Sequence, residues 1–205
     1  MTVKIKFCGL TRICDIEAVN ELMPDYVGFV FWKSSRRYIT PEKAIPLREI
    51  LRPEIIPVGV FADESPEIIA DIAARGIIDV IQLHGRESNE YISRLKSITG
   101  KIIIKAFTVH DESDIRQAEE SPADFVMLDS GKGTGKIFDW SLIRGVKRPY
   151  FLAGGLDPLN VSEAVKILKP YAVDVSSGIE TDGLKDRAKM SAFIEAVRKE
   201  TYYDE

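Results

Sequence analysis

The chain has 205 residues, of which 45% are hydrophobic and 29% are charged, and this composition predicts one globular domain with a large core rather than a disordered chain. Its 28 Lys and Arg against 32 Asp and Glu give a net charge of -4, which argues against a general nucleic-acid-binding protein. The apolar runs are far shorter than the ~20 residues of a membrane-spanning helix. The cysteines, Cys8 and Cys14, form neither a disulfide framework nor a set of zinc ligands. We therefore expect a cytoplasmic protein that binds neither nucleic acid nor membranes and holds no metal.

Short β-branched runs alternate along the chain with amphipathic segments, which is typical of repeating βα units. In chain order, strands are expected at residues 3–8, 26–31, 57–61, 79–84, 102–107, 125–129, 150–153 and 172–176. The expected helices cover residues 13–22, 41–50, 65–75, 88–98, 112–120, 139–146, 158–168 and 187–199. Two of the helix starts carry a capping residue followed by proline, at Thr40-Pro41 and Asp157-Pro158.

Eight strand–helix units leave roughly 26 residues per unit, which is the small end of the range for a (β/α)8 barrel. There is no room for a second domain, so residues 1–205 are predicted to form a single (β/α)8 TIM barrel, with residues 202–205 as a frayed tail. The alternative is a doubly wound open sheet, which usually has fewer strands and a glycine-rich nucleotide-binding turn after the first one. The corresponding turn here reads Cys8-Gly9-Leu10-Thr11, so the barrel is favoured.

Side chains along a barrel strand alternate between the interior and the layer that faces the helices. In the first strand this alternation directs Lys4, Lys6 and Cys8 inward. Unpaired buried charges would cost several kcal/mol each, so we predict lysine–carboxylate pairs inside the barrel, with Lys6 and Asp174 as one candidate. The residues expected to point inward from later strands are Gln82, His84, Lys105, Met127, Asp129, Asp174 and Ser176.

The active site of such a barrel lies at the carboxyl ends of the strands, where Cys8, His84 and Asp129 stand. The Cys8 thiol is a candidate base or nucleophile, although free cysteines are also common buried residues. Asp129 precedes residues 130–136, a small-residue loop of the kind that covers a substrate, and it either performs acid–base chemistry or caps that loop. His84 either contacts substrate or hydrogen-bonds a loop carbonyl.

The loops after the seventh and eighth expected strands indicate a phosphate-binding site. Glycines let backbone N–H groups approach an anion, and barrels of this type bind phosphate between these two loops. Plain turns are the alternative interpretation. A basic segment at residues 33–38 follows the second strand, and its Arg36 and Arg37 either form a solvated surface or bind a second anion such as a carboxylate. The residues of the expected phosphate site are Gly154, Gly155, Ser176, Ser177 and Gly178.

Together these residues form a known pattern. In order along the chain the motifs are KFCGLT at 6–11, GFVF at 28–31, SRRYI at 35–39, VGVF at 58–61, QLHG at 82–85, LD at 128–129, FDW at 138–140, AGGL at 153–156 and VDVSSGIE at 173–180. The chain closely resembles the phosphoribosylanthranilate isomerase family over nearly its whole length. The opening Cys-Gly motif combined with Asp-Val-Ser-Ser-Gly is the most specific part of the resemblance.

The resemblance implies an Amadori rearrangement in tryptophan biosynthesis, from N-(5-phosphoribosyl)anthranilate to 1-(2-carboxyphenylamino)-1-deoxyribulose 5-phosphate, without cofactor or metal. It implies that Asp129 is the general acid that opens the ribose ring and that Cys8 is the general base that removes the C2' proton. It assigns Arg37, or its neighbour Arg36, to the anthranilate carboxylate. The remaining residues expected to bind this small phosphorylated substrate are His84, Gly154, Gly155, Asp174, Ser176, Ser177 and Gly178.

These roles require tuned pKa values. A thiol with a pKa near 8.5 is only about 3% ionised at pH 7, so we expect Lys6 or Lys105 to stabilise the Cys8 thiolate. Asp129 must hold a proton near neutral pH, and burial beside the substrate's anionic groups would favour that form. The expected rate profile is bell-shaped.

Two other functions fit the sequence. One is a related phosphate-binding barrel, either indole-glycerol-phosphate synthase or the histidine-pathway isomerase, which typically has an aspartate where Cys8 stands. The other is an inactive barrel that only binds a phosphorylated ligand. The chain is expected to act as a monomer or a homodimer.

Overall fold

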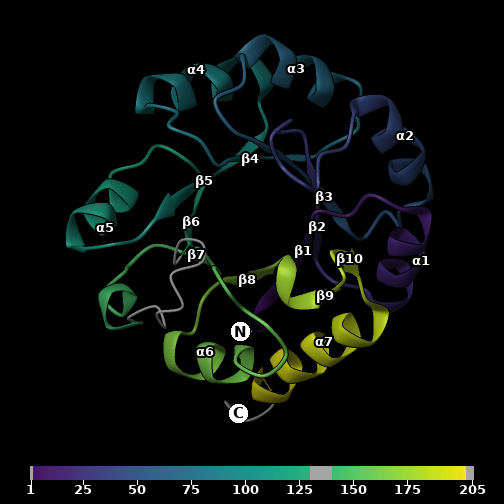
Figure 1. Cartoon of the computed structure of the whole chain (residues 1–205). Coiled ribbons are helices and arrows are strands. Elements are labelled where there is room, and N and C mark those ends of the chain that lie inside the picture. Colours follow the sequence, from purple (N-terminus) through teal and green to yellow (C-terminus); the bar gives the residue numbers. More distant parts are fainter. Residues whose placement is uncertain (1, 130–139, 202–205) are drawn as a thin grey trace.

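The computed structural model describes residues 2–129 and 140–201. Eight parallel strands form a closed barrel in which each strand pairs with the next along the chain and the last pairs with the first (Figure 1). The predicted (β/α)8 barrel is thereby confirmed, with strand boundaries within a residue or so of the expected ones. The strands are β1 (Lys4–Cys8), β2 (Tyr26–Val30), β3 (Ile56–Phe61), β4 (Val80–Leu83), β5 (Ile102–Thr108), β6 (Phe125–Asp129), β7 (Tyr150–Ala153) and β8 (Ala172–Val175).

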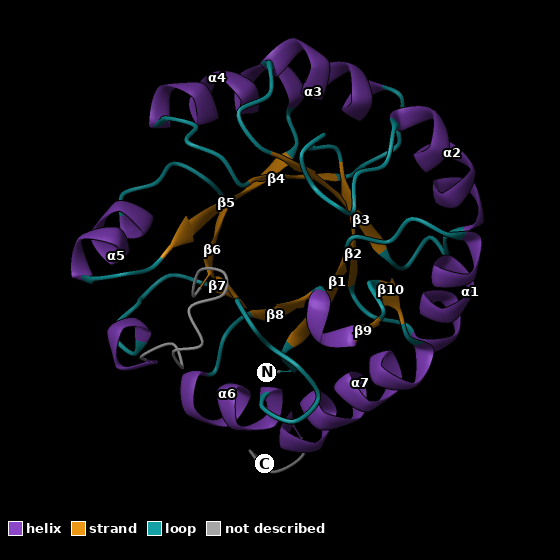
Figure 2. Cartoon of the chain, viewed as in Figure 1, coloured by secondary structure: helices purple, strands orange, loops and turns teal. Residues whose placement is uncertain are grey.

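Helices form a ring outside the strands (Figure 2). The α-helices are α1 (Ile13–Leu22), α2 (Pro41–Ile50), α3 (Pro66–Ala74), α4 (Asn89–Thr99), α5 (Glu112–Glu119), α6 (Val161–Leu168) and α7 (Arg187–Thr201). Smaller elements are the 3-10 helices η1 (Trp140–Ile143) and η2 (Ser177–Ile179) and a hairpin of β9 (Glu180–Thr181) and β10 (Leu184–Lys185). Across the described ranges, none of the helices is both long and apolar enough to cross a bilayer.

Local sequence explains where several helices begin. The side chains of Thr40, Ser65 and Ser88 each accept a hydrogen bond from the backbone N–H three residues later, at the starts of α2, α3 and α4. These bonds satisfy donors that the first turn of a helix leaves unpaired. Pro41 occupies the first turn of α2, so the start predicted at Thr40-Pro41 is confirmed.

The start predicted at Asp157-Pro158 is wrong. The helix α6 begins at Val161, after Asn160. Asp157 instead accepts hydrogen bonds from the backbone N–H groups of Leu159 and Asn160, which closes a turn ahead of the helix. An aspartate before a proline is therefore a turn signal here, and the three extra residues lengthen the loop after β7.

The helix expected at residues 139–146 is also different in its described part, which contains only the four-residue η1. Gly145 follows η1 closely and Pro149 precedes β7, and both residues disfavour a continued α-helix. Residue 139, the small-residue loop expected at 130–136 and the tail expected at 202–205 lie outside the described residues.

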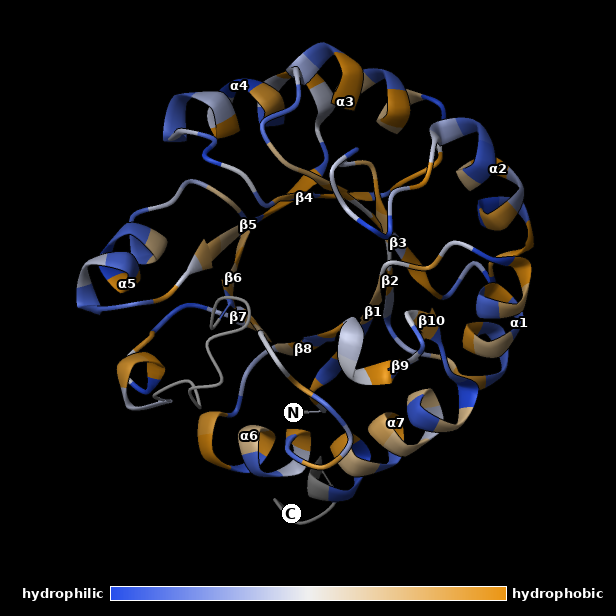
Figure 3. Cartoon of the chain, viewed as in Figure 1, coloured by the Kyte–Doolittle hydropathy of each residue, from blue (hydrophilic) through white to orange (hydrophobic). Residues whose placement is uncertain are grey.

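The strands separate two apolar layers. The outer layer packs between barrel and helices and includes Ile5, Phe7, Val173 and Val175. Figure 3 shows the mostly hydrophobic strands inside helices that carry both hydrophobic and hydrophilic residues. This arrangement leaves alternate strand residues to fill the barrel interior. The inner layer consists of Tyr26, Val58, Val80, Ile104, Ala106, Met127, Phe151, Ala153 and Ala172.

Lys105 departs from the predicted alternation. Its neighbours Ile104 and Ala106 belong to the inner layer, so Lys105 lies on the other face of β5. There its Nζ lies 3.0 Å from Glu87 Oε2 and donates a hydrogen bond to the carbonyl oxygen of Gly85 over 2.6 Å. The prediction that Lys105 points inward is wrong because the inward-facing residues of β5 are Ile104 and Ala106, one position away from the expected ones. Its buried charge is nevertheless paired, as expected of a buried charge.

Candidate active site

Cys8 ends β1 and is 8% exposed. It packs against Val30 and Val60 at the carboxyl ends of β2 and β3. Gly28 lies opposite Cys8 in the pairing of β1 with β2. A Cβ at position 28 would lie 2.8 Å from Cys8 Sγ and 3.3 Å from Lys6 Nζ. The glycine therefore makes room for the thiol and for a lysine ammonium at the same place.

The predicted ion pair inside the barrel is confirmed. Lys6 Nζ lies 2.7 Å from Asp174 Oδ1, and the Lys6 side chain is completely buried. Burial alone would lower the pKa of Lys6, but the charge of Asp174, together with the nearby Cys8, outweighs burial and raises it. Lys6 is therefore a fixed cation beneath the thiol, with its charge balanced by Asp174.

Burial is the largest influence on the Cys8 thiol and raises its pKa. The ammonium groups of Lys6 and Lys185 act in the opposite direction, while Asp174 adds to the effect of burial. The expected influence of Lys6 is thus confirmed in direction. Lys185 takes the place of the other expected cation, Lys105. At neutral pH the thiol of the free protein is mostly protonated, since an ordinary thiol already is.

Asp129 ends β6, where its Oδ2 lies 3.5 Å from His84 Nε2. His84 Nδ1 lies 3.2 Å from Gln82 Nε2, and the Nε2 side of the ring faces Asp129. Sequence reasoning placed His84 against substrate or a loop carbonyl; the structure places it between a buried amide and the candidate acid. Within the described part of the chain, Gln82 Oε1 is buried without a hydrogen-bond partner.

Arg37 is held in a two-pronged ion pair. Its Nε and Nη2 donate to Glu180 Oε1 and Oε2 over 2.6 and 2.7 Å. The stem of Arg37 lies against Gly9, where a Cβ would be 2.4 Å from Arg37 Cδ. Gly9 also has a φ of +81°, a left-handed conformation that favours glycine. Arg36 is exposed, so of the two candidate arginines the structure brings Arg37 to the site.

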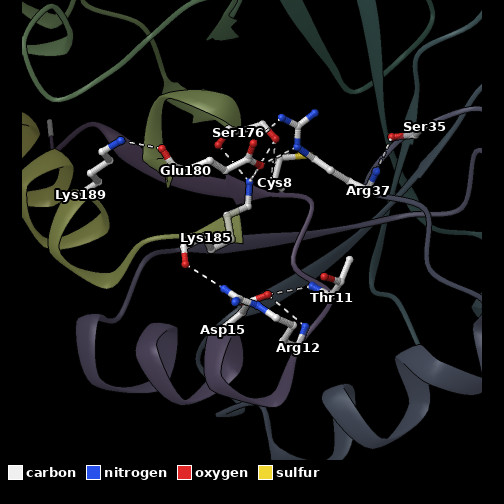
Figure 4. Close-up of polar contacts among 10 residues, drawn as sticks. All are labelled: Cys8, Thr11, Arg12, Asp15, Ser35, Arg37, Ser176, Glu180, Lys185 and Lys189. Atoms are coloured by element: carbon white, nitrogen blue, oxygen red, sulfur yellow. Dashed lines mark hydrogen bonds and ion pairs between the residues drawn. The ribbon is translucent and has the colours of Figure 1, made fainter. Parts of the chain in front are cut away.

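Sequence reasoning missed Lys185, whose ammonium lies beside Ser176 and Glu180 (Figure 4). Its Nζ lies 2.6 Å from Glu180 Oε1, 2.9 Å from the Ser176 carbonyl oxygen and 3.2 Å from Ser176 Oγ. The Ser176 hydroxyl donates to the carbonyl oxygen of Cys8 over 3.0 Å. Hydrogen bonds from Arg37 and Lys185 overcome the effect of burial and lower the pKa of Glu180. Glu180 is therefore an ionised partner of two cations.

The hairpin that carries Lys185 has a recognisable sequence signal. Asp182 and Gly183, with φ values of +52° and +79°, form the two-residue turn between β9 and β10. An Asp-Gly pair between short extended runs is among the strongest local signals for a tight hairpin. The role of Lys185 in the site, by contrast, depends on a fold that returns the hairpin to the end of β1.

The two loops expected to bind phosphate are in direct contact. Gly154 and Gly155 follow β7 with φ values of +93° and +66°. A Cβ at Gly178, in η2, would lie 2.0 Å from the carbonyl oxygen of Leu156. Such a close approach of two backbones requires glycine, and it places the N-terminus of η2, with Ser177, beside the loop after β7. The glycines and serines named by the sequence are thus brought together at the carboxyl ends of neighbouring strands.

The fold and this set of side chains define a class of protein: a (β/α)8 barrel with a buried thiol, a carboxylate and an arginine at the carboxyl ends of its strands. The family model for N-(5'phosphoribosyl)anthranilate (PRA) isomerase matches residues 5–196. The chain belongs to this family, and the resemblance found in the sequence is confirmed.

Individual relatives agree with the family match. The N-(5'-phosphoribosyl)anthranilate isomerase of Thermoanaerobacter sp. (strain X514) is 46% identical over 203 residues, covering 96% of this chain and 98% of the relative. The crystal structure of phosphoribosyl anthranilate isomerase from Thermotoga maritima superposes with a TM-score of 0.87 at 39% identity, covering 96% of this chain and 99% of that one. A structure of such an isomerase in complex with reduced 1-(o-carboxyphenylamino)-1-deoxyribulose 5-phosphate has a TM-score of 0.85 at 38% identity and the same coverage.

Proposed function

We propose that the protein isomerises N-(5'-phosphoribosyl)anthranilate to 1-(2-carboxyphenylamino)-1-deoxyribulose 5-phosphate in tryptophan biosynthesis, with Asp129 as general acid and Cys8 as general base. The activity is that of the family to which the chain belongs. The observation that carries the residue roles is the placement of a buried thiol and a carboxylate at the carboxyl ends of β1 and β6. Both side chains belong to the inward-facing set of their strands.

The first step is opening of the ribose ring. Asp129 donates its proton to the ring oxygen, the bond from C1' to that oxygen breaks, and the lone pair of the anthranilate nitrogen forms a C1'=N double bond. His84 presents its Nε2 side to Asp129 and is suited to hold that carboxyl group in place. The product of this step is a protonated Schiff base with a free hydroxyl on the former ring oxygen.

The second step is proton removal from C2'. The Cys8 thiolate takes this proton, and the electrons of the C–H bond move toward the Schiff base to give an enolamine. Tautomerisation of the enolamine, with a proton added at C1', gives the ketone. Each proton removed is returned to the substrate or to the enzyme, so the overall change is an isomerisation that needs no cofactor or metal.

Two anionic groups of the substrate have candidate partners. Arg37 uses Nε and Nη2 for Glu180, which leaves the edge formed by its terminal nitrogens to receive the anthranilate carboxylate. The phosphate is assigned to the glycine-rich contact between the loops after β7 and β8, where backbone N–H groups and Ser177 are available. Asp174 keeps its Oδ1 on Lys6, so its proposed effect on substrate is through the placement of Lys6.

The test is a fluorescence assay of phosphoribosylanthranilate consumption by the purified protein. Cys8→Ser and Asp129→Asn should each lose most of the turnover, and Cys14→Ser, which removes an exposed thiol, should retain it. Wild-type turnover in Cys8→Ser would contradict the assignment of the base. Turnover of the phosphoribosylated imidazole substrate of histidine biosynthesis, with none of the anthranilate compound, would contradict the proposed substrate.

The proposal places the protein in the cytoplasm with a small phosphorylated substrate as its partner. The phosphorylated ligand in the structure of a relative supports this substrate class. Monomer and homodimer are the expected assembly states, and light scattering during size-exclusion chromatography distinguishes them. A mass of about twice the chain mass of 23.0 kDa would identify the homodimer.

A further inference from the structure

Two groups of charged side chains lie near Cys8, and only one of them is neutral overall. Inside the barrel, the Lys6 cation is matched by the Asp174 anion at 2.7 Å. On the hairpin side, Glu180 is shared by two cations, Arg37 and Lys185, each with a nitrogen 2.6 Å from Glu180 Oε1. Two cations against one anion leave a net charge of about +1 in this second group. The excess positive charge near the thiol therefore comes from the group that Arg37, Lys185 and Glu180 form.

We propose that Lys185 is a positioning residue of the isomerase whose ammonium supplies the excess positive charge that favours the thiolate form of Cys8. The inference rests on the proposed role of Cys8 as the base. Lys185 and Glu180 are almost fully buried, with side chains 2% and 8% exposed. Water therefore screens their charges poorly.

Burial lowers the pKa of the Lys185 ammonium, and the hydrogen bond and the charge of Glu180 oppose this effect and hold the ammonium in position. Three acceptor atoms surround Nζ: Glu180 Oε1 and the two oxygens of Ser176. An ammonium has three hydrogens to donate to them. The backbone of the hairpin is held as well, because Arg12 Nη2 donates to the Lys185 carbonyl oxygen over 2.8 Å and Asp15 holds Arg12 (Figure 4). The charge is thus fixed before substrate arrives, which spares the cost of reorganisation during the reaction.

The charge increases the reactive fraction of the enzyme. The reaction needs a protonated Asp129 and an ionised Cys8, and a buried thiol ionises at higher pH than a carboxyl group. Between the two pKa values, the fraction of enzyme in that reactive state is constant and falls tenfold for each unit by which the pKa values move apart. A cation that favours the thiolate narrows this gap and raises turnover.

The test measures the Cys8 thiol without using turnover. In full-length Cys14→Ser protein, the rate of iodoacetamide alkylation of Cys8 is followed against pH by mass spectrometry. Lys185→Gln should move the midpoint of alkylation upward by about one pH unit, equivalent to a tenfold loss of thiolate. Lys185→Arg should keep the midpoint near that of the parent. The matched control is Lys189→Gln, because Lys189 is exposed and donates to the Glu180 carbonyl oxygen on the same hairpin.

A second variant separates charge from structural support. Glu180→Gln leaves both cations and removes their shared anion, so the net charge beside Cys8 rises and the midpoint should move downward. A hairpin that acted only as a mechanical support would not shift the midpoint in opposite directions in Lys185→Gln and Glu180→Gln. Equal midpoints in parent and Lys185→Gln, or shifts of the same sign in both variants, would overturn the inference.

The pH profile of turnover distinguishes the charge effect of Lys185 from the proposed role of Cys8 as the base. The high-pH limb of kcat/KM should move with the alkylation midpoint in each variant. An alkylation midpoint that moves while the turnover profile stays fixed would support the charge effect of Lys185 and overturn the role of Cys8 as the base.

Discussion

At the scale of single residues, the proposed chemistry depends on the protonation states of Cys8 and Asp129, which must be ionised and protonated, respectively. Burial raises the pKa of Cys8, and the cations Lys6 and Lys185 reduce this effect without removing it. Only the minority of molecules with an ionised thiol and a protonated carboxyl group is then competent for catalysis. The low fraction of reactive enzyme follows from burying a base whose charged form burial disfavours.

The pH profile of kcat/KM follows from these states. The reactive fraction rises as pH passes the pKa of the acid, stays level, and falls as pH passes the pKa of the thiol. Because burial raises the latter, the falling limb should lie above the ordinary thiol value near 8.5. Initial rates at low substrate concentration across the pH range measure it. A falling limb well below that value would contradict the assignment.

Arg37 should act mainly on substrate binding. Arg37→Ala removes a charge-assisted pair to the substrate carboxylate, and we expect KM to rise roughly 10- to 100-fold with a smaller change in kcat. Arg36→Ala is the matched control because Arg36 is adjacent and exposed, and it should bind substrate nearly as the parent does. Equal effects of the two substitutions would remove the distinction between these arginines.

At the scale of elements, the site is built by loops that approach one another closely. The turn after β7 and the start of η2 touch through Gly178, and the β9–β10 hairpin returns to the end of β1 through Ser176 and Lys185. These contacts fix the loops that hold phosphate and carboxylate relative to the strands that carry the acid and base. Rigid placement of loops on a barrel is the general way in which this architecture supports catalysis.

The contact at Gly178 can be tested directly. A Cβ there would lie 2.0 Å from the Leu156 carbonyl oxygen and must push the two loops apart. We expect Gly178→Ala to weaken binding of inorganic phosphate and to raise KM by about tenfold or more, with the barrel still folded. Gly145→Ala is the control, since nothing lies within 4 Å of a Cβ at that position. Isothermal titration calorimetry with phosphate reports the difference, and unchanged affinity in Gly178→Ala would argue against a phosphate site there.

At the scale of the whole molecule, closure of the barrel brings together residues from opposite ends of the chain. Lys6 on β1 and Asp174 on β8 are 168 positions apart and form an ion pair across the seam where the barrel closes. Removing one partner of a buried pair leaves a charge without compensation, which is more costly than removing both.

Free energies of unfolding test how much the Lys6–Asp174 pair stabilises the closed barrel. Lys6→Met should lower the free energy of unfolding by about 3–5 kcal/mol in urea titrations, and the double variant Lys6→Met/Asp174→Leu should recover much of the loss. Lys4→Met provides the comparison, because the Lys4–Asp25 pair is partly exposed and should contribute no more than about 1 kcal/mol. A cost for Lys6→Met as small as that for Lys4→Met would show that the buried pair does not hold the seam together.

The sequence by itself determined the barrel, most strand boundaries and the inward direction of Lys6, Cys8 and Asp174, because alternation and capping are local properties of the chain. It also named the family through motifs spread along the chain. The tertiary structure alone decided the phase of β5 that turns Lys105 outward, and the choice between Arg36 and Arg37. It alone revealed that Glu180, 143 positions from Arg37, is the partner that orients it. Such contacts depend on how the closed barrel brings distant loops to one rim, and no local pattern records that arrangement.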